Sequence, residues 1–503
     1  MTDPFKILMV ASECFPFAKS GGLGDVVGIL PQFLKKRGNN VSVVIPLYSF
    51  IDRLKFNINP VIEKMDVWIG NEWVTFGVHR TFLPEEIPVY FIDYEPFFGR
   101  PNMYHDDHFN DYGDNPKRFI FLSKAALQLC HEIDFVPDIV HANDWHTAVL
   151  PALLKRVYRD DPLFSETASI LTIHNIAYQG RYHRDFFAYS GLDNADFTPD
   201  KFECHYALNL LKGGIHFADV VNTVSKGYAR ETLSSPGGNG LEDFLNKKGD
   251  DYAGILNGVD YSQWDPKKDK LIPANYSKKD LTGKSICKNV LQKQLGLETN
   301  EDIPVIGIVG RLVEQKGFYI LSECIEGILN NMDVQFAILG AGDNQLENFF
   351  GSLPRRYSGK IGTYIGYNNE LAHLIEAGSD FFLMPSIYEP CGLNQIYSLK
   401  YGTLPIVRAT GGLNDTIENY DQKTGKGTGF KFLEPSSKAI YNTVEWVMDT
   451  YYNRKPHLIK LIRRAMEQNF PWEDSADEYL RLYNKANEKI MTGKYEASYA
   501  RYH

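Results

Sequence analysis

The chain has 503 residues, more than one hydrophobic core ordinarily supports, so we expect at least two domains. Its formal net charge of −10 argues against binding to nucleic acid or to an anionic membrane surface, because either partner favours a basic protein face. A neutral partner, or an anion held by a few local cations, fits this charge better.

The N-terminal stretch MTDPFKILMVASE enters a strand-like run almost at once, without a signal peptide, and we find no apolar stretch as long as a membrane span. The six cysteines are scattered, with neither a CxxC pair nor a Cys/His cluster. This pattern indicates reduced thiols and argues against a disulfide framework or a structural zinc site. We therefore expect a cytoplasmic protein.

Short apolar runs rich in Val and Ile recur along the chain and are separated by helix-like segments. They lack strict alternation, as strands buried on both faces should, and such strands alternating with helices predict doubly wound parallel sheets in an α/β fold. The runs are KILMVAS (6–12), VSVVIP (41–46), VYFID (89–93), DIVHAN (138–143), SILTIH (169–174), DVVNTVS (219–225), AGILNG (253–258), VIGIVG (305–310), VQFAILG (334–340), DFFLMP (380–385) and PIVRA (405–409).

Two groups of such runs predict two Rossmann-like domains. A polar, lysine-rich stretch broken by prolines follows Asn257 and has the composition of a connection between domains. We place the first domain at residues 1–256 and the second at 257–474. A final amphipathic helix is expected within residues 475–503.

In open α/β sheets, ligands bind where strands end and loops begin. After the first strand, Gly21 and Gly22 allow a ligand close to the backbone, and a helix starting near Asp25 offers free N–H groups to an anion, with Lys19 beside it. A glycine turn that only tightens packing is the alternative. The loop matches neither GxGxxG nor a P-loop, so dinucleotide and Walker-type sites are disfavoured.

The next loops carry histidines and amides at predicted strand ends. We expect His141, Asp144, His146, His174 and Asn175 to cluster there, although any one of these histidines can instead be a structural residue. Their spacing matches no common zinc ligand set.

The second half repeats the arrangement with cations. Arg311 and Lys316 directly follow a predicted strand, as a diphosphate site requires, although solvated surface charges are the alternative. Tyr367, in the stretch GTYIGYNNELAHLI (362–375), has an aromatic ring that can stack on a base or pack in the core.

Glu389 is the only carboxylate near the start of the stretch SIYEPCGLNQIYSLKYGTLPIVRATGG (386–412). A helix is expected to begin around Gly392. Glu389 can bind sugar hydroxyls while the N–H groups of Gly392, Leu393 and Asn394 meet a phosphate. The two features together suit the opposite ends of one nucleotide sugar.

These motifs together resemble the bacterial glycogen synthase and plant starch synthase family over nearly the whole chain. The matching motifs are KSGGLGD (19–25), DWH (144–146), HNIAYQG (174–180), NGVD (257–260), GRLVEQKG (310–317) and EPCGLNQ (389–395). The resemblance implies a retaining glucosyltransferase of the GT-B class, with two facing Rossmann-like domains and a deep cleft between them. It also implies an ADP-glucose donor, an α-1,4-glucan acceptor, no cofactor and no metal.

The resemblance further implies a role for each matching position. Lys19 and Gly22 would contact the donor glucose or its phosphates, and His174 would contact the glucose near the reacting carbon. Arg311 and Lys316 would neutralise the leaving diphosphate. The remaining donor and acceptor contacts would come from Tyr367 on the adenine, Glu389 on the glucose hydroxyls, the backbone of Cys391, Gly392, Leu393 and Asn394, and Asp144 and Asn257 along the site.

Three positions depart from the family pattern. Ser20 replaces the usual Thr, Asn143 stands where many members have His, and Tyr397 stands where the wider superfamily often has a second Glu. A UDP-glucose-dependent transferase and a non-catalytic glycan-binding protein on the same fold remain the alternatives. Because Lys19, His174, Arg311, Lys316 and Glu389 are all present, the sequence favours an enzyme.

Overall fold

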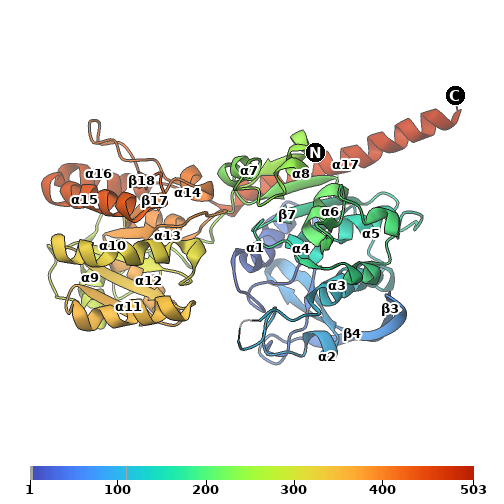
Figure 1. Cartoon of the computed structure of the whole chain (residues 1–503), viewed down its shortest axis with the longest axis horizontal. Coiled ribbons are helices and arrows are strands. Elements are labelled where there is room, and N and C mark those ends of the chain that lie inside the picture. Colours follow the sequence, from blue (N-terminus) through green and yellow to red (C-terminus); the bar gives the residue numbers. More distant parts are fainter. Residues whose placement is uncertain (1–3, 109, 503) are drawn as a thin grey trace. The chain divides into compact units, whose positions relative to one another are not determined.

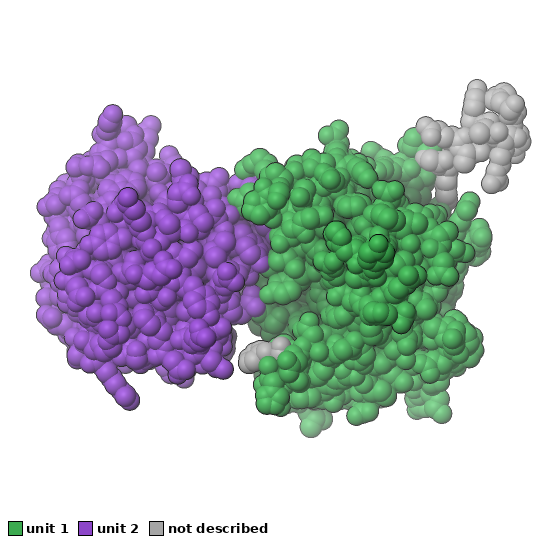
Figure 2. Space-filling view, viewed as in Figure 1, with its two compact units in different colours: residues 1–224, 229–255, 472–503 green, residues 225–228, 256–471 purple. Residues whose placement is uncertain are grey.

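The computed structural model describes residues 4–108 and 110–502, with side chains described as far as residue 492. The chain divides into two compact units, shown in Figure 2. The first unit comprises residues 1–224, 229–255 and 472–503, and the second comprises residues 225–228 and 256–471. The domain boundaries predicted from the sequence, after residues 256 and 474, stay a prediction.

The first unit is built on a nine-stranded sheet in the order β12-β11-β7-β6-β1-β2-β5-β4-β3. All neighbours from β12 to β5 pair in parallel, whereas β4 pairs antiparallel with both β5 and β3. The strands are β1 (Lys6–Val10), β2 (Asn40–Pro46), β3 (Asn59–Ile69), β4 (Glu72–Leu83), β5 (Ile87–Asp93), β6 (Ile139–Asn143), β7 (Ala168–Ile173), β11 (Val220–Thr223) and β12 (Tyr252–Gly254), and a separate small sheet has β8 (Arg181–His183), β9 (Glu203–Cys204) and β10 (Ala207–Asn209).

Helices of the first unit form two groups around this sheet. Helices α1 and α17 contact each other, and α17 also contacts β7 and β11, whereas α3 to α6 contact one another in a second group. The helices are α1 (Gly22–Lys36), α2 (Glu95–Phe98), α3 (Asn115–Glu132), α4 (Asp144–Thr147), α5 (Leu150–Arg156), α6 (Leu210–Phe217), α8 (Glu242–Asn246) and α17 (Trp472–Tyr502), with short 3-10 turns at η1 (Pro84–Glu86), η2 (Arg184–Ser190), η3 (Asn194–Asp196) and η4 (Gly249–Asp251). Helix α7 (Lys226–Thr232) begins in residues of the second unit and ends in the first.

Helix α17 belongs to the first unit although it is the last element of the chain. Its side chains Tyr479 and Tyr483 are fully buried. The Tyr483 hydroxyl lies 2.9 Å from Nδ1 of His141 on β6, and Asn222 on β11 donates to the Tyr479 hydroxyl at 3.3 Å. The end of the chain therefore completes the core that its beginning starts.

The second unit has a six-stranded, wholly parallel sheet in the order β15-β14-β13-β16-β17-β18. Counted along the chain, this is the 3-2-1-4-5-6 order of a doubly wound Rossmann sheet. Its strands are β13 (Val305–Val309), β14 (Gln335–Gly340), β15 (Ile361–Ile365), β16 (Phe381–Met384), β17 (Leu404–Arg408) and β18 (Phe430–Phe432).

The helices of the second unit pack against one another around its sheet and are labelled in Figure 1. Helix α10 contacts α11 and α15, whereas α12 contacts α9 and α13. Their bounds are α9 (Thr282–Gln294), α10 (Phe318–Asn331), α11 (Asn344–Arg356), α12 (Asn369–Gly378), α13 (Asn394–Tyr401), α14 (Gly411–Thr416), α15 (Ser437–Asn453) and α16 (Lys455–Ala465), with one 3-10 turn, η5 (Glu314–Lys316).

The predicted α/β fold class, with two Rossmann-like domains, is confirmed. Every apolar run singled out in the sequence contains a strand of one of the two parallel sheets or overlaps one, although β12 ends at Gly254, earlier than the run AGILNG (253–258) suggested. No helix within the described residues is long and apolar enough to cross a membrane.

Candidate active site

The loop after β1 is held in place by Glu13, a buried acid that the sequence analysis did not select. Its carboxylate accepts hydrogen bonds from the Ser20 amide and hydroxyl, both at 2.6 Å, from the Gly21 amide at 3.3 Å and from the Tyr104 hydroxyl at 2.6 Å. Glu13 is only 4% exposed. These bonds fix the loop directly before α1.

The glycines of this loop leave its surface open. A Cβ atom added at Gly21 or Gly22 would meet no heavy atom within 4 Å. Gly21 is the N-cap of α1 and, being glycine, has no side chain to cap the first turn, so the N–H groups there suit an anionic ligand. At Gly28, by contrast, an added Cβ would lie 2.4 Å from the Phe15 carbonyl oxygen, and this glycine serves packing.

Lys19 and Asp25 form an ion pair beside the loop, with Lys19 Nζ 2.7 Å from Asp25 Oδ1. The lysine side chain is 43% exposed and the aspartate side chain 16%. Burial raises the pKa of Asp25, and the Lys19 ammonium opposes this shift. The lysine is therefore held at the loop but remains accessible to a ligand.

Asp144 joins the ends of two neighbouring strands, β6 and β7. Its backbone adopts a positive φ of 55°, and its Oδ1 accepts hydrogen bonds from the amides of His174 at 2.7 Å and Asn175 at 3.4 Å. Burial raises the pKa of Asp144 to about 7, against the two amide bonds that lower it. The negative charge of Glu13 raises it further, so the carboxyl is poised near neutral pH.

His174 is buried and lies directly after β7. Its Nε2 lies 3.0 Å from Oδ1 of Asn143. An amide oxygen can only accept, so Nε2 carries the proton and Nδ1 is left as an acceptor. Burial lowers the pKa of His174 to about 3, so the ring is neutral at ordinary pH.

Two of the predicted cluster histidines are packed inside the first unit, and Nδ1 of His146 is buried without a hydrogen-bond partner among the described residues. His141 lies within β6, is fully buried, and bonds Tyr483 as described and the Thr172 hydroxyl at 2.6 Å. His146 packs between the rings of Tyr104 and Trp145, at centroid distances of 4.8 Å and 4.1 Å. The prediction that His141 belongs to a strand-end cluster is wrong, because its side chain contacts the α17 side of the sheet.

In the second unit, Lys316 and Glu389 form a close pair. Nζ of Lys316 lies 2.7 Å and 2.9 Å from the two carboxylate oxygens of Glu389, and the Ser386 hydroxyl donates to Glu389 at 2.9 Å. Glu389 is 4% exposed, whereas the Lys316 side chain is 24% exposed. Arg311, in the turn after β13, is exposed. One anionic and two cationic groups thus meet the carboxyl ends of β13 and β16.

The backbone of the glycine pair Gly411-Gly412 packs directly against the backbone of the Glu389 loop. Gly411 has a φ of 43°, and a Cβ added there would lie 2.0 Å from the Glu389 carbonyl oxygen. The Gly412 amide donates to the same oxygen at 3.1 Å, and a Cβ on Gly412 would lie 2.1 Å from the Cys391 carbonyl oxygen. Only glycine allows two backbones to approach this closely. The pair therefore serves to position Glu389.

The segment after Glu389 leads into α13, which begins at Asn394 with Leu393 as its N-cap, two residues later than expected. Gly392 has a φ of 73°. The Asn394 side chain donates to the Val309 carbonyl at 2.8 Å and so ties α13 to the end of β13. The apolar side chain of Leu393 cannot accept a hydrogen bond and so does not cap the helix. N–H groups at the start of α13 are therefore left for a ligand.

Asn257 and Cys391 lie together in the second unit. The backbone N–H of Asn257 donates to the Cys391 sulfur. Burial raises the pKa of the Cys391 thiol to about 12, so the thiol stays protonated. The Asn257 side chain is 4% exposed, and its Oδ1 is buried with no hydrogen-bond partner within the described part of the chain. An orphaned polar atom of this kind is costly unless a ligand satisfies it.

Tyr367 and Tyr397 have different surroundings. Tyr367, after β15, is 86% exposed, so the alternative of a core tyrosine is excluded. Tyr397 stacks on Trp264 with ring centroids 4.0 Å apart, and Trp264 stacks on His373 at 3.7 Å. The position that often carries a second acid elsewhere thus packs α13 onto the segment around Trp264.

Two family models match the chain, the starch synthase catalytic domain over residues 6–247 and the glycosyl transferases group 1 over residues 292–493. The catalytic domain of starch synthase IV from Arabidopsis thaliana, solved with ADP and acarbose, matches with a TM-score of 0.89 at 32% identity, over 97% of this chain and 100% of that one. The fold and these matches define a glycosyltransferase of the GT-B class.

Two curated relatives match at higher identity. Glycogen synthase 1 of Geobacter sulfurreducens is 50% identical over 96% of this chain and 97% of its own length. Glycogen synthase of Treponema denticola is 45% identical over 96% of this chain and 99% of its own length. The chain belongs to the glycogen and starch synthase family, and the predicted family and enzyme class are confirmed. At this level, so is the predicted function of a glycogen synthase.

Proposed function

We propose that this glycogen synthase transfers glucose from ADP-glucose to the non-reducing end of an α-1,4-glucan with retention of configuration. The observation that carries the proposal is the Lys316–Glu389 pair beside the start of α13. It sets a cation for a diphosphate next to an acid for sugar hydroxyls, which matches the two polar parts of a sugar nucleotide.

The second unit would bind the leaving group. As the bond between glucose C1 and the diphosphate oxygen breaks, the electron pair stays on the diphosphate and an oxocarbenium-like sugar forms. Arg311 and Lys316, with the N–H groups of Gly392, Leu393 and Asn394, would stabilise the developing charge. Because Lys316 is partly exposed and Glu389 buried, the ammonium can move to a phosphate oxygen while the carboxylate stays and accepts sugar hydroxyls.

The first unit would orient the sugar. A neutral His174 offers Nδ1 as an acceptor near the reacting carbon, and Asp144 holds the His174 and Asn175 backbone in place. Lys19, Gly21, Gly22 and Asp25 would contribute a cation and helix N–H groups to the phosphates. In the attack step, the acceptor hydroxyl bonds to C1 on the face that the diphosphate leaves, and its proton passes to a diphosphate oxygen.

Three further assignments are part of the proposal. The buried Oδ1 of Asn257 has no partner among the described residues and would accept a hydrogen bond from a hydroxyl group of the bound glucan or donor. Exposed Tyr367 would stack on the adenine, and the Cys391 backbone would assist Glu389 in holding the glucose hydroxyls. The six cysteines are all free thiols, which supports a reducing cytoplasm as the location.

The decisive experiment measures transfer from each donor. The protein is incubated with glycogen and either labelled ADP-glucose or labelled UDP-glucose, and the label in washed polymer is counted. We expect faster incorporation from ADP-glucose, with the label released as maltose by β-amylase, which shows α-1,4 linkage at chain ends. Preference for UDP-glucose would overturn the donor assignment. Absence of incorporation from both would overturn catalysis and favour a glycan-binding protein.

A further inference from the structure

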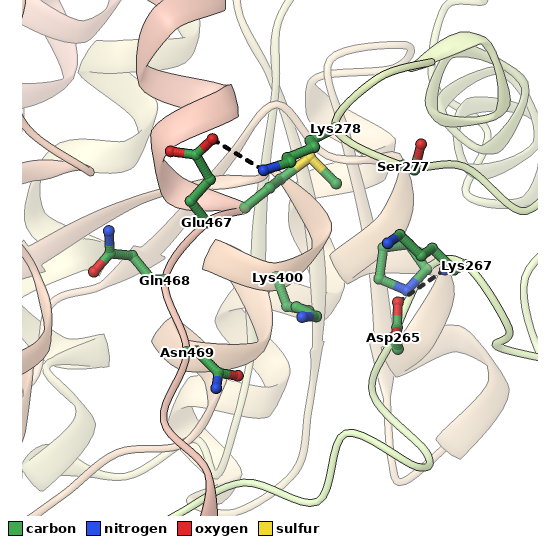
Figure 3. Close-up of a pocket in the computed structure, with 10 residues that line it drawn as sticks. Asp265, Lys267, Ser277, Lys278, Lys400, Glu467, Gln468 and Asn469 are labelled. Atoms are coloured by element: carbon green, nitrogen blue, oxygen red, sulfur yellow. Dashed lines mark hydrogen bonds and ion pairs between the residues drawn. The ribbon is translucent and has the colours of Figure 1, made fainter.

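A cavity lined by both polar and apolar groups lies in the second unit, at the end of α13 opposite to Glu389. Its volume is about 280 Å³. Three stretches line it, as Figure 3 shows: residues 265–267 with 277 and 278, Lys400 in the last turn of α13, and residues 466–469 after α16. None of these residues takes part in the reaction proposed above.

Three lysines line this cavity, although the whole chain carries a formal net charge of −10. Lys267, Lys278 and Lys400 line the wall, against the two acids Asp265 and Glu467. Lys267 and Lys400 form no salt bridge with a carboxylate anywhere in residues 4–108 and 110–492.

Both acids in the wall are already engaged. Oδ1 of Asp265 accepts a hydrogen bond from the backbone amide of Lys267 at 3.0 Å. Glu467 forms an ion pair with Lys278 at 3.0 Å. This pair is exposed, so Lys278 can leave Glu467 for another anion at little cost. Three lysines therefore face two carboxylates at the cavity, an excess of one cation.

Lys400 shows the effect of this crowding. Burial lowers its pKa, Asp265 opposes the shift, and the charges of Lys267, Lys268 and Lys278 lower the pKa further. Its ammonium lies over the Tyr261 ring, 4.6 Å from the centroid, so the side chain is directed by packing. A bound anion would relieve the repulsion among these lysines.

The walls of the cavity are tied together next to it. The Val259 amide donates to the Phe470 carbonyl at 2.9 Å, and the Phe470 amide donates to the Tyr261 hydroxyl at 3.0 Å. The chain enters the second unit at residue 256 and leaves it after residue 471. The stretch after the entry and the stretch before the exit are therefore joined by hydrogen bonds, and each contributes one side of the cavity.

We propose that this cavity binds a small phosphate ester as a site separate from the catalytic one. A phosphate dianion matches several convergent ammonium groups, and lysine binds phosphate as a point charge. Ser277, Gln468 and Asn469 offer hydroxyl and amide partners for the rest of the ligand. The cavity is small for a nucleotide, since drug-sized sites span roughly 300–1,000 Å³. The ligand would bridge the two stretches and order them.

Hydrogen exchange of the full-length protein tests the proposal, because it reads the two stretches directly. Glycerol 3-phosphate is the probe, and glycerol in sodium chloride of equal ionic strength is the control. We expect the probe to slow exchange in peptides covering 265–278 and 466–469 together. The proposal fails if these peptides do not respond, or if glycerol protects them equally.

Variants locate the effect at the cavity. Lys400→Gln should raise the midpoint concentration for protection about tenfold, as expected for one lost charge-assisted hydrogen bond. The matched control is Lys270→Gln, an exposed lysine of the same stretch that does not line the cavity, and it should leave the midpoint unchanged. An unchanged midpoint in Lys400→Gln would overturn the site. If that variant fails to fold, Lys278→Gln carries the same expectation and the same refuting result.

Discussion

Replacing Glu389 by glutamine tests the role of the Lys316–Glu389 pair, because the substitution keeps the shape and removes the charge. The Ser386 hydroxyl can still donate to the amide oxygen, whereas Lys316 loses both of its charged contacts, at 2.7 Å and 2.9 Å. Glu389 is almost fully buried, so few waters can replace its interactions.

Two magnitudes follow from this geometry. Hydrogen bonds to charged groups contribute about 1.5–3 kcal/mol and neutral ones about 0.5–1.5 kcal/mol. Since the Lys316 side chain is 24% exposed and can turn to water, we expect Glu389→Gln to lower the free energy of unfolding by about 1–2 kcal/mol. Loss of contacts to the sugar should lower kcat/KM about a hundredfold or more, which corresponds to about 2.7 kcal/mol of transition-state stabilisation.

The assay combines denaturant unfolding with initial rates of glucosyl transfer for Glu389→Gln, Lys316→Gln and the double variant. We expect the two unfolding effects to be non-additive by about 1 kcal/mol, as for residues in direct contact. Glu323→Gln, an exposed acid on α10, is the control and should change neither quantity. A folded Glu389→Gln protein with activity within threefold of the control would refute the catalytic role. Additive unfolding effects would refute the structural pair.

Three more predictions concern metal, donor binding and pH. Glucosyl transfer should persist in EDTA if, as proposed, cations of the chain neutralise the leaving group. Loss in EDTA with recovery on adding magnesium would contradict this. Tyr367→Ala should raise the KM for the donor severalfold and change the free energy of unfolding by less than about 0.5 kcal/mol, since the ring is 86% exposed; an unchanged KM would exclude stacking on the base. Burial raises the pKa of Asp144 from 3.8 to about 7, so the folded chain holds this proton over a pH range in which the unfolded chain has released it. The stability of the wild type relative to Asp144→Asn should therefore fall as pH rises from about 4 to 7, which melting temperatures of both proteins would show; a constant difference would refute the shift.

Most parallel strands were predictable because strands buried on both faces require continuous apolar runs. The partly exposed β15 and the three-residue β18 lay in none of these runs. The edge hairpin β3–β4 was not predicted, because one of its faces is exposed. In β4, exposed Trp73 and Thr75 alternate with buried Val74 and Phe76, a period-two pattern that the search for apolar runs passed over. The alternation itself was the available signal.

Within the candidate site, sequence motifs located the loops and not the contacts inside them. Glu13 lies far from Tyr104 in sequence, and only the parallel order of the strands brings their side chains together. The Gly411-Gly412 pair was visible in the sequence, but its close approach to the Glu389 backbone depends on the packing of β17 beside β16. His141 was selected from its motif, but its actual partner is Tyr483, 342 residues later in the chain. Its sequence neighbours gave no sign of this contact.

The position of α17 has a consequence for how the protein is made. On the ribosome, residues up to 255 emerge before the second unit, but the first unit lacks the segment that carries Tyr479 and Tyr483 until residues 256–471 have been translated. The unit that begins first is thus completed last, after the entire second unit has been synthesised. A nascent or truncated chain ending before Trp472 would leave the apolar surface beside β7 and β11 uncovered, and such surfaces recruit chaperones or aggregate. The last helix therefore makes the full-length chain a condition for a finished first unit.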